Sequence, residues 1–206
     1  MPSNALAKFK RTIARCEALV DSYKVLHAQN RKDGATPAPK DIIRGAVVLA
    51  VAALDAYVTD VFCEKLVPYL KRYKSDDSLV KLLSDAGLDT REALNLLSME
   101  RPYRRIRTLI TRHYETYTTQ KFNVIDEIFL PFRLKNITCN AEAKTGKKRL
   151  KKSVGLLVDR RNEIAHGGDY NSHGRIKNIN EDQIAKRIKH LEQLVIAIDE
   201  IICNRI

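Results

Sequence analysis

A long apolar segment at residues 40–72 constrains the fold of this chain more than any other feature. Between residues 42 and 54 its apolar side chains lie nearly all round a helix of 3.6 residues per turn. Such a helix has to be covered on every side, which places it at the centre of a helical fold. Its longest uninterrupted apolar run, Ala46 to Leu54, is too short to span a bilayer. We therefore predict a core helix and no membrane contact.

Two amphipathic segments supply cover for this helix. Residues 4–28 carry apolar side chains at helical spacing, and so does the last stretch of the chain, where Asn180 and Gln183 form a predicted N-terminal capping box. Asp76-Asp77 and Asp89-Thr90 predict the starts of short helices. Further helices are expected over residues 103–118 and 147–166, with a polar loop over 169–179.

The remaining stretches predict loops. Gly and Pro within residues 30–39 indicate a break. Residues 119–146, which contain Pro131 and Gly146, are expected to be irregular and to form a small insertion over the core. Residues 1–206 are thus expected to form a single all-α domain, an antiparallel helical bundle with short extra helices.

The composition agrees with a helical, basic protein. Leu, Ile, Ala, Lys, Arg and Glu dominate the 206 residues, Trp is absent and only 8 residues are Gly. The net charge is +12 and the isoelectric point is about 9.6. Such a surplus indicates a polyanionic partner, with nucleic acid favoured; the alternative is a solvated basic surface.

The cysteines and the N-terminus suggest a reducing compartment. Cys16, Cys63, Cys139 and Cys203 form no C-x-x-C pair, and three of them fall inside helical apolar patterns, which predicts buried thiols. The first residues have no signal-peptide apolar core. We therefore expect a cytoplasmic protein.

The segment 159–168, Asp-Arg-Arg-Asn-Glu-Ile-Ala-His-Gly-Gly, carries most of the chemical information. It places Arg161, Asn162 and His166 within one and a half helical turns, before a glycine pair. An Arg followed by a His within six residues is a weak signal alone, since Arg107 and His113 repeat it. The specificity comes from the context: Asn follows the Arg, Ala precedes the His, and two glycines follow.

This stretch resembles the Arg-Asn-x-x-x-His signature of HEPN domains, and most closely the RiboL-PSP-HEPN subgroup. The resemblance is sharp over residues 157–168 and compatible over the rest. It implies a HEPN-like helical bundle. Many HEPN proteins are metal-independent ribonucleases, often toxins or defence effectors, that act as dimers. The resemblance thus implies a homodimeric endoribonuclease, with no cofactor and no metal, and with an antitoxin or a nucleotidyltransferase as an expected partner.

Helix geometry bears separately on the motif. Arg161 falls on the apolar stripe of its own helix, where a charge is costly unless it is paired or faces a cleft. Arg161 and His166 are five residues apart, about 140° around a helix. One helix therefore does not bring the two side chains together, whereas two facing copies would.

The residue types suit metal-independent RNA cleavage. An imidazole can remove or supply a proton near neutral pH, and a guanidinium can hold a phosphate and stabilise its charge. Asn162 would orient His166 or the phosphate, and Arg161, Asn162 and His166 are the predicted catalytic residues. Predicted substrate-binding residues are Arg160, Lys147, Lys148, Lys151 and Lys152. Predicted supporting residues are Asp55, Glu163, Gly167, Tyr170 and His173.

Structural explanations compete with these roles. His166 could be a helix C-terminal imidazole favoured by the helix dipole. Arg161 could form a buried salt bridge to Asp55 or Glu163, the glycine pair could only end the helix, and Asp55 could face solvent. If Asp55 is functional, it is the acid that fixes Arg161. Tyr170 and His173 either line the same cleft or are merely exposed.

Two basic tracts flank these elements, one at residues 144–152 and one at residues 101–112. Each could be a solvated helix face. The first leads into the motif helix and is favoured as a surface that follows the phosphates of RNA. The alternative functions are a non-enzymatic HEPN-like module that binds RNA, nucleotide or a protein partner, and a purely structural helical interaction domain.

Overall fold

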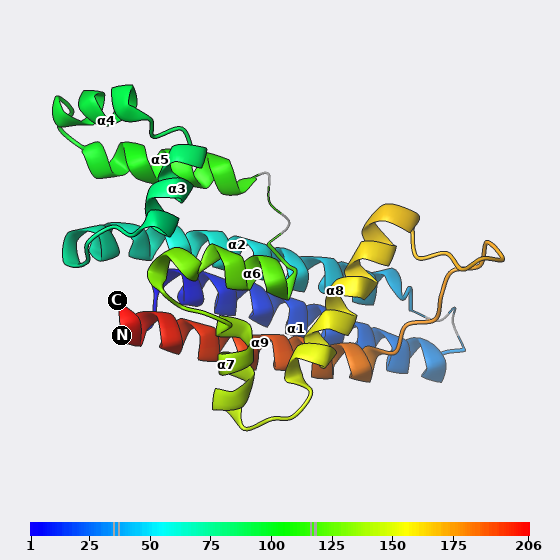
Figure 1. Ribbon diagram of the computed structural model, residues 1–206. Helices are drawn as coiled ribbons and strands as arrows, with labels where there is room; N and C mark the ends of the chain where they lie inside the picture. Colours follow the sequence, from blue (N-terminus) through cyan, green and yellow to red (C-terminus); the bar gives the residue numbers. More distant parts are fainter. Residues whose placement is uncertain (35, 37, 116, 118) are drawn as a thin grey trace.

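The computed structural model describes residues 1–206 except 35, 37, 116 and 118, and its regular structure in the described part is helical. Three long helices lie side by side: α1 (Asn4–Lys32), α2 (Asp41–Arg72) and α9 (Glu181–Arg205). Both termini lie at the same end of this bundle (Figure 1). The predicted all-α bundle is confirmed.

The helix α2 forms the centre of the core, as its sequence predicts. Leu54, Val58 and Phe62 are among its fully buried side chains. By length and composition α2 could cross a membrane, since an 18-residue window within it has a mean hydropathy of 1.9. However, 61% of that window is buried inside the protein. Its apolar surface is thus used for packing against α1, α8 and α9.

Specific side chains fix the starts of several helices. Ser3, Asp76, Asp89 and Asn180 are N-caps whose side chains accept hydrogen bonds from backbone N–H groups in the first turn. The predicted starts at Asp76, Asp89 and Asn180 are confirmed. The Ser3 hydroxyl also hydrogen-bonds Asp199 of α9, which joins the N-terminus to the last helix.

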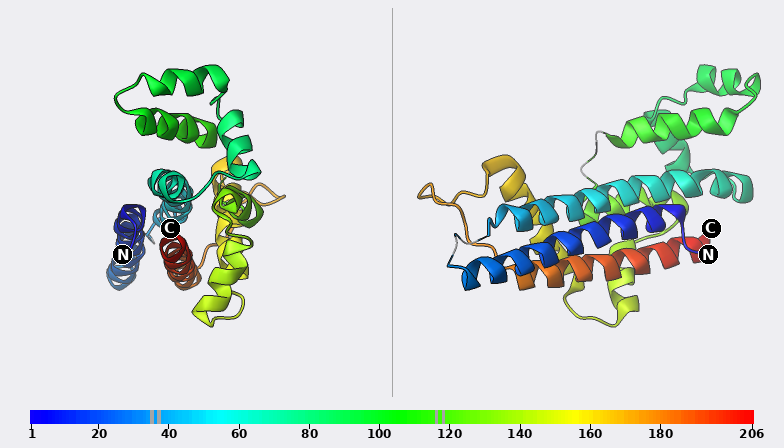
Figure 2. Two further views of the ribbon diagram at one scale, coloured as in Figure 1. Left: turned by 60° about the vertical axis from the view of Figure 1, so that its left-hand side comes forward. Right: turned by 180° about the vertical axis from the view of Figure 1, so that it is seen from behind.

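A small arm of three helices projects from one end of α2 (Figures 1 and 2). It consists of α3 (Asp77–Asp85), α4 (Thr90–Leu97) and α5 (Pro102–Glu115). Tyr114 of α5 packs edge-on against Phe62 of α2, with ring centroids 5.2 Å apart. The predicted continuation of α5 to residue 118 partly falls on positions outside the described residues.

The segment 119–146 is more ordered than its sequence suggests. It contains α6 (Phe122–Ile128), the 3₁₀ turn η1 (Leu130–Phe132) and α7 (Ile137–Thr145). The prediction of irregular structure is therefore wrong. Each piece is short, and residues with positive φ such as Arg133, Asn136 and Gly146 interrupt it, so no long apolar period marks it in the sequence. Buried Phe129, Phe132 and Ile137 supply the stabilisation.

The helix α8 (Leu150–Gly167) crosses the bundle and packs on α2 and α9. Leu150, Val154 and Leu157 form its buried stripe. The predicted start at residue 147 is three residues early, because Arg149 has φ 66° and begins the helix from a left-handed conformation. The polar loop over 169–179 follows, with a single isolated bridge between Tyr170 and Ile176.

The four cysteines are free, and their burial differs. Cys16 and Cys63 are buried, Cys203 is partly buried and Cys139 is exposed. Burial raises the pKa of the Cys16 thiol to about 11, so it remains protonated at neutral pH. The buried thiols of Cys16 and Cys63 act as small apolar groups in the core.

Candidate functional site

The motif helix ends where the glycine pair predicts. Gly167 is the last helical residue, and Gly168 has φ 61°, a conformation that glycine adopts without strain. A Cβ at Gly168 would lie 3.0 Å from the ring of Tyr170. The backbone N–H groups of Gly168 and Asp169 donate to the carbonyls of Ile164 and Glu163. Backbone groups, rather than the His166 imidazole, therefore cap the helix end.

Arg161 points inward toward α2, as its place on the apolar stripe predicts. Its side chain is 20% exposed, and its Nη2 lies 3.6 Å from Oδ2 of Asp55. Its Nη1 donates to Oδ1 of Asn162 at 3.0 Å. The alternative partner Glu163 is engaged elsewhere. Asp55 is thus the acid beside Arg161, and Asn162 contacts the guanidinium rather than His166.

Thr119 holds Asp55 in place from the segment that follows α5. Its hydroxyl donates to Oδ1 of Asp55 at 2.7 Å, and the residue is only 2% exposed. Burial raises the pKa of the Asp55 carboxyl above its usual range, and the Thr119 hydrogen bond and the charge of Arg161 oppose that rise. Asp55 therefore carries a charge that is costly to keep and that Arg161 and Thr119 stabilise.

His166 lies on the opposite side of α8. It is exposed, and no hydrogen bond or ion pair joins its ring to another described residue. Because α8 is helical from Leu150 to Gly167, His166 is turned about 140° from Arg161. The imidazole is thus available for proton transfer, but it does not face the Arg161 guanidinium of its own chain.

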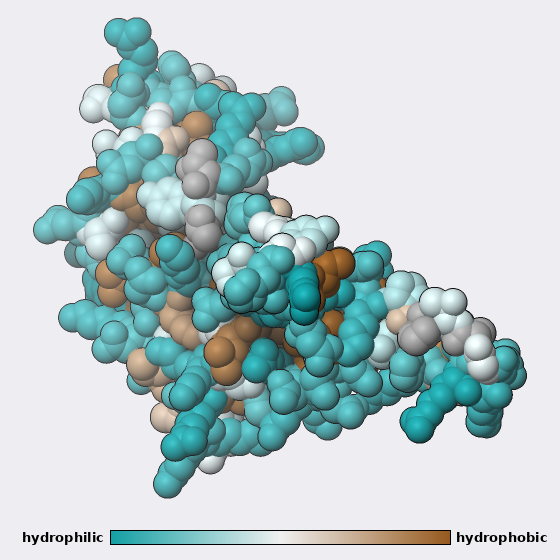
Figure 3. Space-filling model, turned by 90° about the vertical axis from the view of Figure 1, so that its right-hand side faces the viewer, coloured by the Kyte–Doolittle hydropathy of each residue, from teal (hydrophilic) through white to brown (hydrophobic). Residues whose placement is uncertain are grey.

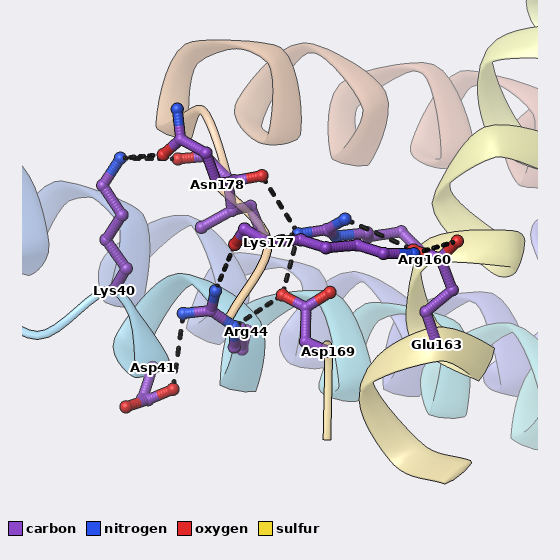
Figure 4. A network of polar contacts seen from close by, with 9 residues as sticks. Lys40, Asp41, Arg44, Arg160, Glu163, Asp169, Lys177 and Asn178 are labelled. Carbon is purple, nitrogen blue, oxygen red and sulfur yellow. Dashed lines mark hydrogen bonds and ion pairs between the residues drawn. The ribbon is translucent and has the colours of Figure 1, made fainter. Parts of the chain in front are cut away.

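Arg160, the neighbour of Arg161, has an internal role. Its Nη2 donates to Oδ2 of Asp169 at 2.7 Å and to the backbone carbonyl of Asn178 at 3.1 Å, and its Nη1 donates to Glu163 at 3.3 Å. Figure 4 shows this guanidinium among its partners. Both of its terminal nitrogens are engaged by internal partners, so we leave Arg160 out of the residues proposed to bind substrate.

Asp169 joins α8 to α2 through two arginines. Its Oδ2 accepts from Arg160 and also from Nε of Arg44, each at 2.7 Å, and its side chain is fully buried. Arg44 further donates to the backbone carbonyl of Lys177 at 2.7 Å (Figure 4). We call Arg44, Asp169 and Arg160 the arginine clamp. It fastens both ends of the loop after the motif to the bundle.

Glu163 and Lys177 extend the clamp toward solvent. Lys177 Nζ lies 3.0 Å from Oε1 of Glu163. The hydrogen bond from Lys177, with a further contribution from Arg160, lowers the pKa of the Glu163 carboxyl. Glu163 therefore stabilises the loop over residues 169–179 and does not pair with Arg161.

The other predicted residues are spread around this centre. Tyr170 is 55% exposed, and His173 is exposed in the same loop. A Cβ on Gly167 would meet open space. Figure 3 looks onto this end of the molecule, where most of the surface is hydrophilic and hydrophobic residues show in a small central area.

The predicted lysines begin at the opposite end of α8. Lys147 donates to Gln193 at 2.8 Å, and Lys151 lies over the ring of Phe122, 5.2 Å from its centroid. Lys148 and Lys152 are exposed. Within the described residues no three His, Cys, Asp or Glu side chains are grouped so that they could hold a metal ion.

Sequence reasoning missed Arg44, Asp169 and Thr119. Arg44 carries a signal, because it interrupts an apolar run in the central helix and a charge there needs a partner. Asp169 follows a glycine pair like many surface turn residues. Nothing near Thr119 in the sequence links it to Asp55.

Comparison with protein families agrees with this arrangement. The RiboL-PSP-HEPN family model matches residues 10–204, nearly the whole chain. The chain belongs to the RiboL-PSP-HEPN family. The match covers every helix that positions the motif, and HEPN membership supports a ribonuclease-type domain. Neither a search of curated proteins nor a search of solved structures gave a significant match.

Proposed function

We propose that this HEPN domain is a metal-independent endoribonuclease that cleaves RNA by attack of the ribose 2′-hydroxyl. The observation that carries the proposal is the difference between two adjacent arginines. Arg160 makes four hydrogen bonds, to Asp169, to Glu163 and to the carbonyls of Lys177 and Asn178, whereas among the described residues Arg161 makes one, to Asn162, beside an acid 3.6 Å away. The Arg161 guanidinium thus keeps donors for a phosphate.

The proposed reaction uses His166 and Arg161 on one phosphodiester. A base removes the proton of the 2′-hydroxyl, the 2′-oxygen bonds to phosphorus, and the bond from phosphorus to the 5′-oxygen breaks. An acid returns a proton to that oxygen, which leaves a 2′,3′-cyclic phosphate and a 5′-hydroxyl. His166 provides one of these proton transfers. Arg161 stabilises the charge on the phosphate, and Asn162 and Asp55 orient Arg161.

The proposed assembly is a homodimer in which the motif helices face each other. Within one chain His166 and Arg161 point about 140° apart, so a second copy has to supply one of the two groups. The exposed end of α8, with open space beside Gly167, permits close approach of that copy. Exposed Tyr170 and Ile176, each 55% exposed, border the same end.

The proposed setting is a cytoplasmic toxin or defence effector, with an antitoxin or a nucleotidyltransferase as partner. It rests on the resemblance of the motif and on the basic surface. The tract at residues 144–152 is proposed to add affinity for RNA, chiefly through exposed Lys148 and Lys152. A non-enzymatic module that binds RNA, nucleotide or a protein is the alternative function.

Incubation with total RNA in EDTA tests the proposal. We expect cleavage to continue in the chelator and the fragments to carry 5′-hydroxyl and cyclic phosphate ends. A strict requirement for added divalent metal in the chemical step would refute the mechanism. Binding of RNA without any cleavage would favour the non-enzymatic alternative.

A further inference from the structure

The helix α5 carries a row of arginines on its solvent side. Arg104, Arg105 and Arg112 lie on one face of α5, with Thr108 between the last two, and Arg101 directly precedes Pro102, the first residue of the helix. Arg105 is paired with Glu92, with Nε 2.6 Å from Oε1. Arg101, Arg104 and Arg112 are exposed, and no hydrogen bond or ion pair joins their side chains to other residues that the structure describes. We call these three the arginine stripe.

The other face of α5 is fixed to the bundle. Ile106, Ile110 and Tyr114 are buried. The Thr111 hydroxyl lies 3.4 Å from the sulfur of Cys63, and Tyr114 packs on the neighbouring Phe62. The stripe therefore faces away from α2 on a helix whose position is set by packing.

The stripe leads toward the candidate site. Arg112 follows Thr111, whose hydroxyl contacts Cys63 of α2. Along α2, Cys63 is eight residues from Asp55, which corresponds to about 12 Å between the two positions. Thr119, just beyond α5, hydrogen-bonds Asp55 itself. Figure 1 shows α5 lying over α2 with its C-terminal end directed toward α8. A polymer that follows the outer face of α5 toward its C-terminal end would therefore run in the direction of α8 and the Arg161 site.

We propose that the arginine stripe binds the phosphates of the single-stranded RNA that enters the candidate site, an inference that rests on the proposed function. The stripe is about 16 Å long, and its guanidiniums have the fork geometry that suits phosphate oxygens. RNA is favoured because no ion pair among the described residues neutralises these three cations, although Glu100 adjoins Arg101 and Glu115 follows Arg112 by three residues. A single strand is favoured because attack by the 2′-hydroxyl requires the ribose and phosphate to rotate into line.

Arg107 is left out of the stripe on structural grounds. It lines a hollow of about 580 Å³ between α1, α2 and α5, together with Lys8, Arg11, Asp60 and Glu64. Arg107 therefore faces a hollow of mixed charge rather than the outer face of α5. The proposal therefore concerns the outer face of α5 alone.

The experiment compares the triple variant R101Q/R104Q/R112Q with the wild-type protein. Glutamine keeps the helix propensity of arginine while removing its charge. The probe is a fluorescein-labelled 2′-O-methyl oligouridylate, which cannot be cleaved by 2′ attack and is long enough to span α5 and the motif. Fluorescence anisotropy gives its affinity across a series of KCl concentrations. We expect weaker binding by the variant and a salt slope shallower by about 2, at roughly 0.7 per lost phosphate contact.

The matched control is K10Q/R15Q/K189Q, which removes three exposed charges from α1 and α9. We expect it to retain the wild-type salt slope. Equal effects of the two triple variants would overturn the proposal, as would a wild-type protein that does not bind the oligouridylate. Loss of binding confined to duplex RNA would refute the single-strand assignment.

Cleavage is scored separately on natural RNA, so that the two proposals can fail independently. Stripe-dependent binding without any cleavage by the wild-type protein would reject the ribonuclease but keep the RNA surface. Cleavage with stripe-independent binding would keep the ribonuclease and reject the surface. Circular dichroism melting of both variants establishes that each is folded.

Discussion

Arg160 donates to Asp169 at 2.7 Å, and this buried ion pair ties the last turns of α8 to the loop that follows them. The same carboxylate oxygen accepts from Arg44 of α2. Ion pairs therefore help to fix the loop after the motif to the bundle. Its attachment should depend strongly on the Asp169 carboxylate, which Arg160 and Arg44 share.

Asp169→Asn should destabilise the protein strongly. Asparagine tolerates the positive φ of 65° at this position, so the substitution mainly removes the charge that two buried arginines share. Breaking such a buried pair costs about 3–5 kcal/mol. Urea unfolding measures the loss.

Asp41→Asn is the control for this prediction. Asp41 contacts the same Arg44 at 3.4 Å, but its side chain is 78% exposed. Its loss should change the free energy of unfolding by less than about 1 kcal/mol. A comparable cost for the two substitutions would show that the clamp does not depend on Asp169.

Asp55→Asn should change the pH dependence of stability. Burial raises the pKa of the Asp55 carboxyl in the folded protein, so the carboxyl binds its proton more tightly in the folded state than in the unfolded state. The resulting stabilisation is present below the ordinary aspartate pKa and is lost as the pH rises through the raised value. Relative to the variant, the wild-type protein should therefore gain stability as the pH falls through this window.

Urea unfolding of both proteins at a series of pH values measures this difference, and a constant difference would contradict the assignment. The same variant should cleave RNA more slowly at neutral pH, because Arg161 loses the acid beside it. Thr119→Ser retains the hydroxyl that holds Asp55 and serves as the mild control for activity.

His166→Ala and Arg161→Ala should each abolish most RNA cleavage. Loss of one acid or base group typically costs about 10²–10⁴-fold, and loss of the guanidinium removes charge stabilisation from the phosphate. Both variants should remain folded, since His166 is exposed and, among the described residues, the Arg161 side chain contacts only Asn162 and Asp55 through polar interactions. Initial rates on a defined RNA measure the effect.

His113→Ala tests whether the correct Arg–His pair has been chosen. His113 lies in the last turn of α5, beside Tyr114 and Tyr117, on a different helix from the motif. Its substitution should leave most of the activity. A larger loss of activity from His113→Ala than from His166→Ala would show that Arg107 and His113, and not Arg161 and His166, form the functional pair.

Mixed dimers should recover activity from two inactive chains. If the site combines Arg161 of one copy with His166 of the other, mixing the Arg161→Ala and His166→Ala proteins forms one composite site with both groups intact. Partial recovery of the cleavage rate is expected, together with a dimer in analytical ultracentrifugation. Full activity of a strictly monomeric wild-type protein would rule out this arrangement.

Particular residues show how far the sequence could be interpreted. The apolar period of α2 predicted its burial, Asp76, Asp89 and Asn180 predicted helix starts, and the glycine pair predicted the end of α8. These features are local, because caps and helical periods act within a few residues. Residues 119–146 were misjudged because their helices are short and depend on burial of Phe129, Phe132 and Ile137 by distant segments.

The sequence alone determined the helical class, the family signature and the place of Arg161 on an apolar stripe, since each depends on residue type and spacing along one helix. Only the tertiary structure decided which of the two adjacent arginines, Arg160 or Arg161, is held by internal ion pairs and hydrogen bonds. Arg160 and Arg161 differ by about 100° around α8, so one meets Asp169, which Arg44 also contacts, while the other meets Asp55. Arg44 and Asp169, which meet beside Arg160, are 125 positions apart in the chain, and such contacts depend on how whole helices pack.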